Sequence, residues 1–352
     1  MKRIALIGCG RISQRHLQVI SQIPDLHLAA VCDHQPDRVA AASQATGVPA
    51  YLDAIEMVER EKPEIVSILT DSGSHARLGV SLAGRVPVII VEKPMALTLE
   101  DADALIEACD RNGTRLFVVK QNRYNPPVKK LRNTLEQGHF GKPVLGTVRV
   151  RWCRDQSYYD QDAWRGTWQN DGGVFSNQAS HHIDLLQWMM GPVESVKAYI
   201  ATRLVDIEAE DTGVAVLKFK SGALGVIEAT TGSRPKDLEG SLSILGEKGS
   251  VVIGGFAVNK LETWNFSDPA VQAEGSEDPS QSVPNVYGLG HHAFYLDVLQ
   301  SLTKGVGHML HGLEGRKSLE IINALYESAS TGQEVHLSYV PHSVRLGRPS
   351  GK

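Results

Sequence analysis

Residues 2–16, KRIALIGCGRISQRH, decide the fold of the N-terminal part of the chain. Their nearly continuous apolar run over residues 3–7 is typical of a parallel strand that is buried on both faces. Gly8-Cys9-Gly10 interrupts this run, and a helical pattern begins at Ile12. A glycine-rich turn between a buried strand and a helix N-terminus is typical of a loop that binds phosphate groups. We therefore expect a dinucleotide-binding unit here.

The turn from Gly8 to Ser13 matches the pattern G-x-G-x-x-G, with Ser13 in place of the third glycine. Gly8 permits the tight turn, and Gly10 lets the backbone approach a pyrophosphate at the helix N-terminus. Ser13 is a small substitute at the contact between helix and strand. The cofactor-binding residues expected in this loop are Gly8, Gly10, Arg11 and Ile12.

Asp33 ends the second predicted strand, 23 residues after Gly10. A carboxylate at this place accepts hydrogen bonds from the adenosine ribose and repels a 2′-phosphate, which favours NAD over NADP. His34 and Arg38 lie nearby and weaken this preference, because a cation could accommodate a phosphate. The alternative is that Asp33 is only an acidic turn residue.

The hydrophobic pattern of the chain changes near residue 121. Up to there, strands at 3–7, 26–33, 64–70, 86–94 and 116–122 alternate with helices at 12–22, 35–47, 74–85 and 98–113, which predicts a parallel α/β sheet. Beyond it, period-two stretches with glycine turns at 144–152, 193–204, 211–231 and 240–255 predict a mainly antiparallel sheet. We predict further helices at 127–137, 180–190, 289–303 and 313–330, and a loop or contact arm at 268–284. The expected domains are a Rossmann fold over 1–121 and an α+β domain over 122–352, built on an open-faced sheet.

Polar residues follow the third and fourth strands of the parallel sheet, at the edge where ligands bind in such folds. Thr70, Ser72 and His75 are expected to contact the cofactor, although His75 could instead cap the next helix. Lys93 ends the apolar run 86–91 beside the nicotinamide end of a bound dinucleotide. A cation there can hydrogen-bond a substrate hydroxyl and polarise a forming carbonyl. Pro94 fixes the backbone, and we hypothesise a cis bond before it.

Composition excludes several classes of function. The net charge of −4 and the lack of a basic stripe argue against nucleic acid as a partner. No apolar stretch reaches the roughly 18 residues that a membrane span needs. The four cysteines have no paired spacing, so we expect free thiols in a reducing cytoplasm. The adjacent histidines at 181–182 and 291–292 diverge on a helix, and we expect no metal site.

Gly8-Cys9-Gly10, Asp33, Glu92-Lys93-Pro94 and the stretch GGVFSNQASHHIDLL at 172–186 resemble the glucose–fructose oxidoreductase/inositol dehydrogenase/rhizopine-catabolism (Gfo/Idh/MocA) family. The resemblance covers essentially the whole chain. It implies a Rossmann domain, an open-faced sheet domain, and oxidation or reduction of a sugar or cyclitol carbon with NAD(P).

The second family signature identifies His181 as the catalytic base or acid, assisted by Lys93. His182 points about 100° away around the helix, so we expect it to be structural. The family pattern has Asp where this chain has Asn177, and Gly where it has Ala179. A neutral Asn177 beside the site suggests a substrate that already carries negative charge.

Longer stretches at 120–131, 158–199 and 286–295 resemble a narrower group, the WlbA-type UDP-N-acetyl-2-amino-2-deoxyglucuronate 3-dehydrogenases. That resemblance implies NAD, a UDP-sugar substrate, and a 3-keto product for transamination toward a diacetamido-uronic acid of bacterial surface polysaccharide (lipopolysaccharide O-antigen). It leaves open whether NADH is released or reoxidised in place by a 2-oxo acid such as 2-oxoglutarate.

Further binding residues are expected on this basis. Those for the cofactor are Glu92, Lys93, Gln121, Trp164 and Arg165; those for the substrate are Lys93, Arg123, Arg154, Tyr159, Asn177, Gln178, Ser180 and His181. Apolar residues on both faces of the strands near 214–227 predict a homo-oligomer, and the resemblance favours a tetramer. The rival functions are a dehydrogenase of a free sugar or inositol, and a non-catalytic NAD-binding sensor.

Overall fold

The structure is a computed structural model that describes residues 1–283, 285–304, 311–338 and 340–349. The chain divides into two compact units: unit 1 comprises Met1–Lys120 and His291–Arg316, and unit 2 comprises Gln121–Gly290 and Lys317–Lys352. The predicted domain boundary at residues 121 and 122 stays a prediction. The expected second domain, 122–352, includes the helix predicted at 289–303. The contacts of His291–Arg316 instead group this helix with unit 1. Helical periodicity identifies a helix but not the sheet on which it packs.

Unit 1 contains a six-stranded, wholly parallel sheet in the order β3-β2-β1-β4-β5-β6. Its strands are β1 (Lys2–Ile7), β2 (Leu26–Cys32), β3 (Ala50–Tyr51), β4 (Ile65–Ile68), β5 (Val88–Val91) and β6 (Arg115–Val118). β4 and β5 are buried along their whole length, as a strand covered on both faces should be. The order reverses at β1, which lies between β2 and β4, so the ligand crevice of this fold opens at the carboxyl end of β1.

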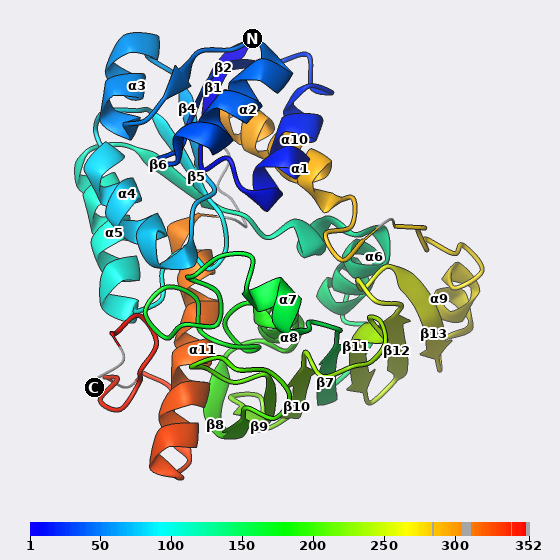
Figure 1. The fold of residues 1–352 in the computed structure, drawn as a ribbon. Helices are drawn as coiled ribbons and strands as arrows, with labels where there is room; N and C mark the ends of the chain where they lie inside the picture. The colour runs from blue at the N-terminus through cyan, green and yellow to red at the C-terminus, as the bar shows by residue number, and fades with distance from the viewer. Residues whose placement is uncertain (284, 305–310, 339, 350–352) are drawn as a thin grey trace. The chain divides into compact units, whose positions relative to one another are not determined.

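Six helices cover the sheet of unit 1: α1 (Arg11–Ile20), α2 (Pro36–Thr46), α3 (Ala54–Glu61), α4 (His75–Leu82), α5 (Leu99–Arg111) and α10 (Gly290–Lys304). Figure 1 shows α1, α2 and α10 on one face and α3, α4 and α5 on the other. The predicted cap of α5 is present, because the Thr98 side chain accepts a hydrogen bond from the Asp101 amide at 3.1 Å. β3 and α3 were not predicted: β3 has only two residues, and α3 is a short helix capped by Asp53.

Unit 2 is built on an eight-stranded sheet in the order β13-β12-β11-β7-β10-β9-β8-β14. Its strands are β7 (Pro143–Arg151), β8 (Val193–Ala201), β9 (Thr212–Phe219), β10 (Leu224–Thr230), β11 (Glu239–Gly246), β12 (Gly249–Gly254), β13 (Lys260–Phe266) and β14 (Val335–His336). Only the central pair β7 and β10 is parallel among these described strands. The prediction of a mainly antiparallel sheet is confirmed.

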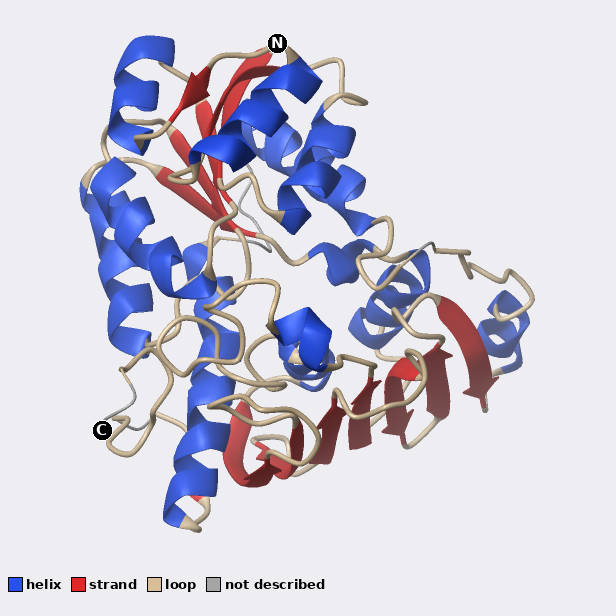
Figure 2. Ribbon diagram, viewed as in Figure 1, coloured by secondary structure: helices blue, strands red, loops and turns tan. Residues whose placement is uncertain are grey.

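One face of this sheet is covered and the other is open. Helix α8 (Ser180–Met190) packs against β7 and β11, and Figure 2 shows α7 and α8 on that side of the sheet. In β9, Ala215, Leu217 and Phe219 are buried, whereas Val214 and Val216 are 46% and 57% exposed. Tyr199 and Leu224 on the neighbouring strands are also exposed. The alternation of buried and exposed apolar residues agrees with the prediction that apolar side chains lie on both faces of these strands.

The remaining helices are α6 (Pro126–Glu136), α7 (Gln156–Tyr159), α9 (Pro269–Glu274) and α11 (Gly312–Thr331). The expectation of a loop throughout 268–284 is wrong at its start, because Asp268 caps α9 through the Ala270 amide. A short helix with few apolar residues gives a weak periodic signal. No helix within the described ranges has both the length and the apolarity to span a bilayer.

Candidate active site

Gly8 stands where no other residue fits. Its φ is +100°, and a Cβ at this position would lie 2.7 Å from the carbonyl carbon of Leu69, at the end of the neighbouring strand. The Gly8 amide also donates to the Cys32 carbonyl at 2.8 Å, which joins the loop to the end of β2. The turn is therefore held between the ends of β2 and β4, as the phosphate-loop interpretation requires.

Gly10 is the N-cap of α1, and no side chain caps this helix. A Cβ on Gly10 would meet no described atom closer than 3.9 Å, that atom being the Arg38 guanidinium nitrogen. Ser13 occupies the third position of the pattern and donates to the Gly10 carbonyl at 2.6 Å. The open helix N-terminus, with exposed Arg11 and half-buried Ile12 in its first turn, fits a dinucleotide pyrophosphate.

Asp33 braces the loop as well as facing the crevice. Its Oδ2 accepts from the Cys9 amide and its Oδ1 from the Gln35 amide, both at 2.8 Å, and the residue is 6% exposed. Each carboxylate oxygen retains a second lone pair for a ribose hydroxyl. The bond to Cys9 joins the second strand to the glycine turn, a link that sequence reasoning missed.

The segment after β4 is held by its own side chains. Ser74 donates to the Thr70 hydroxyl at 2.6 Å, and Ser72 is buried. His75 places Nδ1 at 2.8 Å from the Pro94 carbonyl and Nε2 at 3.0 Å from the Thr70 carbonyl. Because carbonyl oxygens only accept, both bonds form together only when the ring is protonated. The cofactor role expected for His75 stays a prediction, and this bracing is its observed role.

Lys93 follows β5, is half-buried, and is joined to Pro94 by a cis peptide bond. Glu92 Oε2 accepts from the Lys93 amide at 2.9 Å. Burial by itself raises the pKa of the Glu92 carboxyl, but the hydrogen bond from His16 and the interaction with His291 outweigh it and hold that pKa well below its usual range. Glu92 is therefore an anion inside unit 1, and its predicted contact with the cofactor stays a prediction.

Two imidazoles face Glu92, from His16 and from His291 of the adjacent pair at 291–292, and the sequence pattern predicts this contact for neither. His16 Nε2 lies 3.0 Å and His291 Nε2 lies 3.6 Å from Glu92 Oε1, and none of the three residues is more than 6% exposed. Their ligand atoms lie within 4.8 Å of one another, a spacing that a metal ion could bridge. The 3.0 Å separation is an ordinary hydrogen-bond length, so we interpret the group as a hydrogen-bonded cluster. His16 Nδ1 extends it to the Tyr295 hydroxyl at 2.7 Å.

In unit 2, His181 occupies the first turn of α8 and is 7% exposed. Its Nε2 lies 2.9 Å from the side-chain nitrogen of Gln121, another predicted site residue. An amide N–H donated to Nε2 makes that nitrogen the acceptor and leaves the proton on Nδ1; a turned amide would reverse the tautomer. Only the turned amide, whose oxygen accepts from Nε2–H, makes Nδ1 the acceptor and keeps the lone pair of the base out of the Gln121 bond. Burial lowers the pKa of the adjacent His182 to about 4.

The side chain of Asn177 is hydrogen-bonded to a carboxylate. Its side-chain nitrogen donates to Asp171 Oδ1 at 2.6 Å, while Asp171 Oδ2 accepts from the Gly166 amide at 2.8 Å. A carboxylate thus lies behind the neutral amide, which weakens the suggestion that Asn177 by itself implies an anionic substrate. Ser180 donates to the Asn177 carbonyl at 2.9 Å, and Gln178 is 5% exposed.

Glu210 and Tyr326 hold the segment that leads to His181. Glu210 Oε1 accepts from the Phe175 amide and from the Tyr326 hydroxyl, both at 2.9 Å, and Tyr326 in turn accepts from the Gly173 and Ser176 amides at 3.2 Å. Burial raises the pKa of the Glu210 carboxyl to about 7. These partners lie far along the chain, and no local pattern identifies them.

The predicted substrate arginines differ in their surroundings. Arg123 is 1% exposed and binds Asp184 through two bonds of 2.8 Å, with its guanidinium 4.9 Å from the Trp188 ring. This arrangement stabilises the start of unit 2 against α8. The substrate role of Arg123 remains a prediction, and its geometry is that of a structural ion pair.

Arg154 and Arg165 are placed differently. Both guanidiniums lie against the Tyr158 ring, at 5.4 Å and 4.5 Å from its centroid, and Arg165 also lies 4.8 Å from the Trp164 ring. Their carboxylate partners are Asp237 and Asp162. Tyr159, by contrast, is 5% exposed and pairs its hydroxyl with Thr231 at 3.2 Å. Two cations around one aromatic ring form a suitable site for an anionic group.

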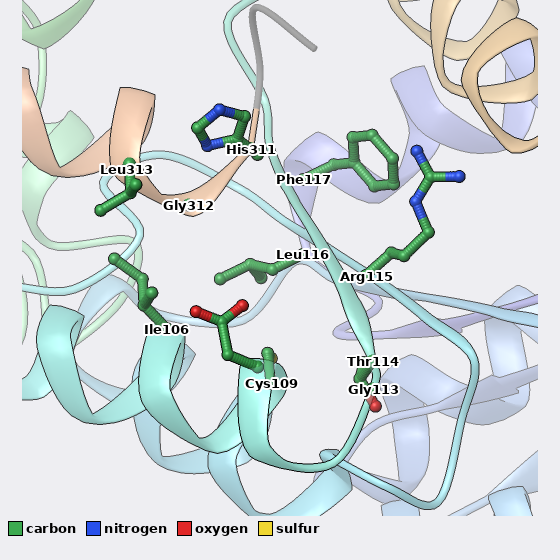
Figure 3. A pocket seen from close by; sticks show the side chains of 11 residues that line it. Ile106, Cys109, Gly113, Thr114, Arg115, Leu116, Phe117, His311, Gly312 and Leu313 are labelled. Carbon is green, nitrogen blue, oxygen red and sulfur yellow. The ribbon is translucent and has the colours of Figure 1, made fainter. Parts of the chain in front are cut away.

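A separate pocket of about 380 Å³ lies between the end of α5, β6 and the start of α11 (Figure 3). Arg115, Asp110 and His311 are among its lining residues. It contains none of the predicted site residues. The four cysteines are free, as predicted.

The fold of unit 1, its glycine turn and the acid at the end of β2 define a dinucleotide-binding oxidoreductase. The chain belongs to the Gfo/Idh/MocA oxidoreductase family: residues 2–120 match its NAD-binding Rossmann fold and residues 132–337 match its C-terminal alpha/beta domain. The cofactor is NAD.

Relatives within the family act on different sugars. The chain is 30% identical to the D-apiose dehydrogenase of Paraburkholderia graminis, over 95% of this chain and 89% of the relative. It is 32% identical to the myo-inositol 2-dehydrogenase of Thermotoga maritima, over 74% of this chain and 76% of the relative. The crystal structure of the WlbA dehydrogenase from Bordetella pertussis, in complex with NADH and UDP-GlcNAcA, is similar with a TM-score of 0.89 and 41% identity, over 96% of this chain and 99% of that one.

Proposed function

We propose that this protein oxidises the 3-hydroxyl of UDP-N-acetyl-2-amino-2-deoxy-D-glucuronate to the 3-keto sugar nucleotide with NAD. One observation carries the proposal: 41% identity, nearly end to end, with a WlbA dehydrogenase whose structure holds UDP-GlcNAcA. That identity exceeds the 30% and 32% shared with the dehydrogenases of D-apiose and myo-inositol.

The chemistry divides between a proton and a hydride. Bound NAD would supply the acceptor for the hydride that leaves the sugar C3. His181 takes the proton of the 3-hydroxyl at Nδ1, the acceptor nitrogen when the Gln121 amide oxygen accepts from Nε2–H, and the C3–O bond becomes the carbonyl. The Lys93 ammonium donates a hydrogen bond to the same oxygen and stabilises the negative charge that develops there.

The anionic groups of the substrate need cations. We assign the uronate carboxylate or the pyrophosphate to Arg154 and Arg165, since both guanidiniums face Tyr158 and stay partly exposed. Asn177, Gln178 and Ser180 supply neutral donors and acceptors to the sugar. Arg123 and Tyr159 keep their predicted substrate roles, with less support because both are almost fully buried.

Several cofactor contacts also belong to the proposal. Gly8, Gly10, Arg11 and Ile12 hold the pyrophosphate, and Asp33 holds the adenosine ribose. The contacts proposed near the nicotinamide end are Thr70, Ser72, His75, Glu92, Lys93, Gln121, Trp164 and Arg165.

The biological setting is proposed on the same grounds. The product would enter transamination toward a diacetamido-uronic acid of bacterial surface polysaccharide, in the cytoplasm, where free thiols persist. The open sheet face with Tyr199, Val214, Val216 and Leu224 supports a homo-oligomer, which we propose to be a tetramer.

The test is the absorbance of NADH when purified protein meets NAD and UDP-N-acetylglucosaminuronate, with and without 2-oxoglutarate. Growth of the NADH band without the oxo acid supports the substrate and a released cofactor. Formation of 2-hydroxyglutarate and 3-keto sugar only when both are present supports a cofactor that is recycled in place. No reaction, with myo-inositol or D-apiose oxidised instead, favours a free-sugar dehydrogenase. NAD binding without turnover of any of them favours a sensor.

A further inference from the structure

Main-chain groups on both sides of Lys93 are held by buried side chains. Before it, Glu92 Oε2 accepts from the Lys93 amide at 2.9 Å. After it, His75 Nδ1 lies 2.8 Å from the carbonyl of Pro94. Glu92 is 6% exposed and His75 is 1% exposed, so water does not compete for either bond. The Pro94 carbonyl is therefore tied to α4, whereas the Lys93 amide is tied to the side chain of the preceding residue.

The Glu92 carboxylate is itself held in place. His16 from α1 and His291 from α10 face its second oxygen, at 3.0 Å and 3.6 Å. Behind His16, the Tyr295 hydroxyl bonds Nδ1 at 2.7 Å and lies 3.3 Å from the Ser67 hydroxyl on β4. A buried carboxylate with donors on both oxygens has one stable orientation.

A lysine side chain has four rotatable bonds, so its ammonium is placed precisely enough for catalysis only when its backbone does not move. The hydrogen bonds around Lys93 hold the main chain of the turn on both sides of this residue. Replacing Glu92 by a neutral residue would release the Lys93 amide and would remove a negative charge from beside the lysine.

We propose that Glu92 and His75 are positioning residues that clamp the main chain on the two sides of Lys93, and that His16, His291 and Tyr295 lock the Glu92 side of this clamp. The proposal rests on the function proposed above, since it assumes that Lys93 acts on the substrate oxygen. It differs from that function in giving Glu92 and His75 a role that needs no contact with cofactor or substrate.

The decisive variant is Glu92→Gln. Glutamine has the same length, but one end of its amide donates, so it cannot accept both from the Lys93 amide and from the imidazoles. We expect kcat to fall about 100-fold with KM for the sugar nucleotide changed less than about twofold. His75→Gln should lower kcat in the same way, and Tyr295→Phe should lower it least.

The pH profile distinguishes positioning from simple loss of stability. The titratable groups that face Glu92 are His16 and His291, with Tyr295 behind His16 and Arg15 near His291. Removing the anion beside Lys93 should lower the pKa of its ammonium. The alkaline limb of the kcat profile should therefore move to lower pH by about one pH unit in Glu92→Gln.

Thr114→Val is the matched control. Thr114 is also buried and bonds backbone groups of unit 1, donating to the Val86 carbonyl at 2.9 Å and accepting from the Gly84 amide at 2.8 Å, near the other end of β5. We expect this variant to lose stability with kcat and its pH profile unchanged.

Each failure has its own signature. If Lys93→Ala retains wild-type turnover, the proposed function fails. If Lys93→Ala is inactive but Glu92→Gln behaves like Thr114→Val, the clamp is refuted and the function stands. A stoichiometric metal ion in the purified protein that is lost in Glu92→Gln would also overturn the clamp, because the ion would replace the hydrogen bonds that lock Glu92.

Discussion

The glycine turn of unit 1 and the segment Asp171–His181 of unit 2 hold their functional residues in opposite ways. In the turn, Gly8, Gly10 and Asp33 are placed by backbone geometry: a φ of +100°, a helix start and two main-chain amides. In Asp171–His181, the holding partners are side chains from far along the chain, such as Glu210 and Tyr326. A backbone site can be recognised from a short motif, whereas a side-chain site needs the folded chain.

The largest expected effect tests whether both regions supply catalytic groups. Lys93→Ala and His181→Ala should each reduce kcat by about 1,000-fold, because the first removes the cation that stabilises negative charge on the substrate oxygen and the second removes the base that takes its proton. NAD affinity, measured by fluorescence titration, should change little in His181→Ala. Wild-type turnover in either variant would remove that residue from the mechanism.

A matched pair of glycine variants tests the backbone account of the turn. Gly8→Ala should lower stability by roughly 2–3 kcal/mol, since the new Cβ meets the Leu69 carbonyl and the φ is left-handed. Gly10→Ala should fold normally but bind NAD about tenfold more weakly, because its Cβ occupies space open to the pyrophosphate. Thermal denaturation and NAD titration measure the two effects. Equal stability of both variants would contradict this account.

Gln121→Glu tests the side-chain account of His181. A carboxylate 2.9 Å from the imidazole nitrogen would stabilise the protonated ring and raise its pKa. His181 would then act as a base only at higher pH, so the acidic limb of kcat should move upward by about one pH unit. Gln121→Leu, which carries no charge, should lower kcat without this shift. An unchanged limb in Gln121→Glu would place the base elsewhere.

Asp33→Asn compares the two roles of Asp33. The amide oxygen can still accept from one of the two main-chain amides, so the fold should persist. Loss of the negative charge should weaken NAD binding about tenfold and reduce the discrimination against NADP. Parallel titrations with NAD and NADP measure this, and an unaltered ratio of the two affinities would refute the ribose assignment.

A last prediction concerns the pH dependence of unit 2. The folded-state pKa of Glu210 is about 7, against an ordinary value of 4.5, so the folded protein binds this proton more tightly than the unfolded chain. Stability should therefore fall as pH rises from about 4.5 to 7, by on the order of 3 kcal/mol. In Glu210→Gln, the free energy of unfolding measured with urea should decline less over this pH range. A Gln variant with the same slope would assign the dependence to another group.

Particular residues show how far sequence reasoning reached. Gly8, Gly10 and Asp33 lie where the motif predicts, and the predicted helix 180–190 coincides with α8. His16, Asp171, Glu210 and Tyr326 were missed, because each acts through a partner on another element. His16 lies four residues after Ile12, inside the very helix that the motif opens, but its partners Glu92 and Tyr295 are 76 and 279 residues away.

The sequence by itself determined the two-part architecture, the cofactor loop and the family. The architecture and the loop depend on hydrophobic period, glycine conformation and helix starts, all of which act over a few residues, whereas the family follows from the resemblance of longer motifs. Only the tertiary structure decided which unit α10 joins, that Arg123 pairs with Asp184, and that Glu92 is locked by two imidazoles. Such pairings depend on the closure of long loops and on the burial of charge, and neither produces a recognisable pattern in the neighbouring sequence.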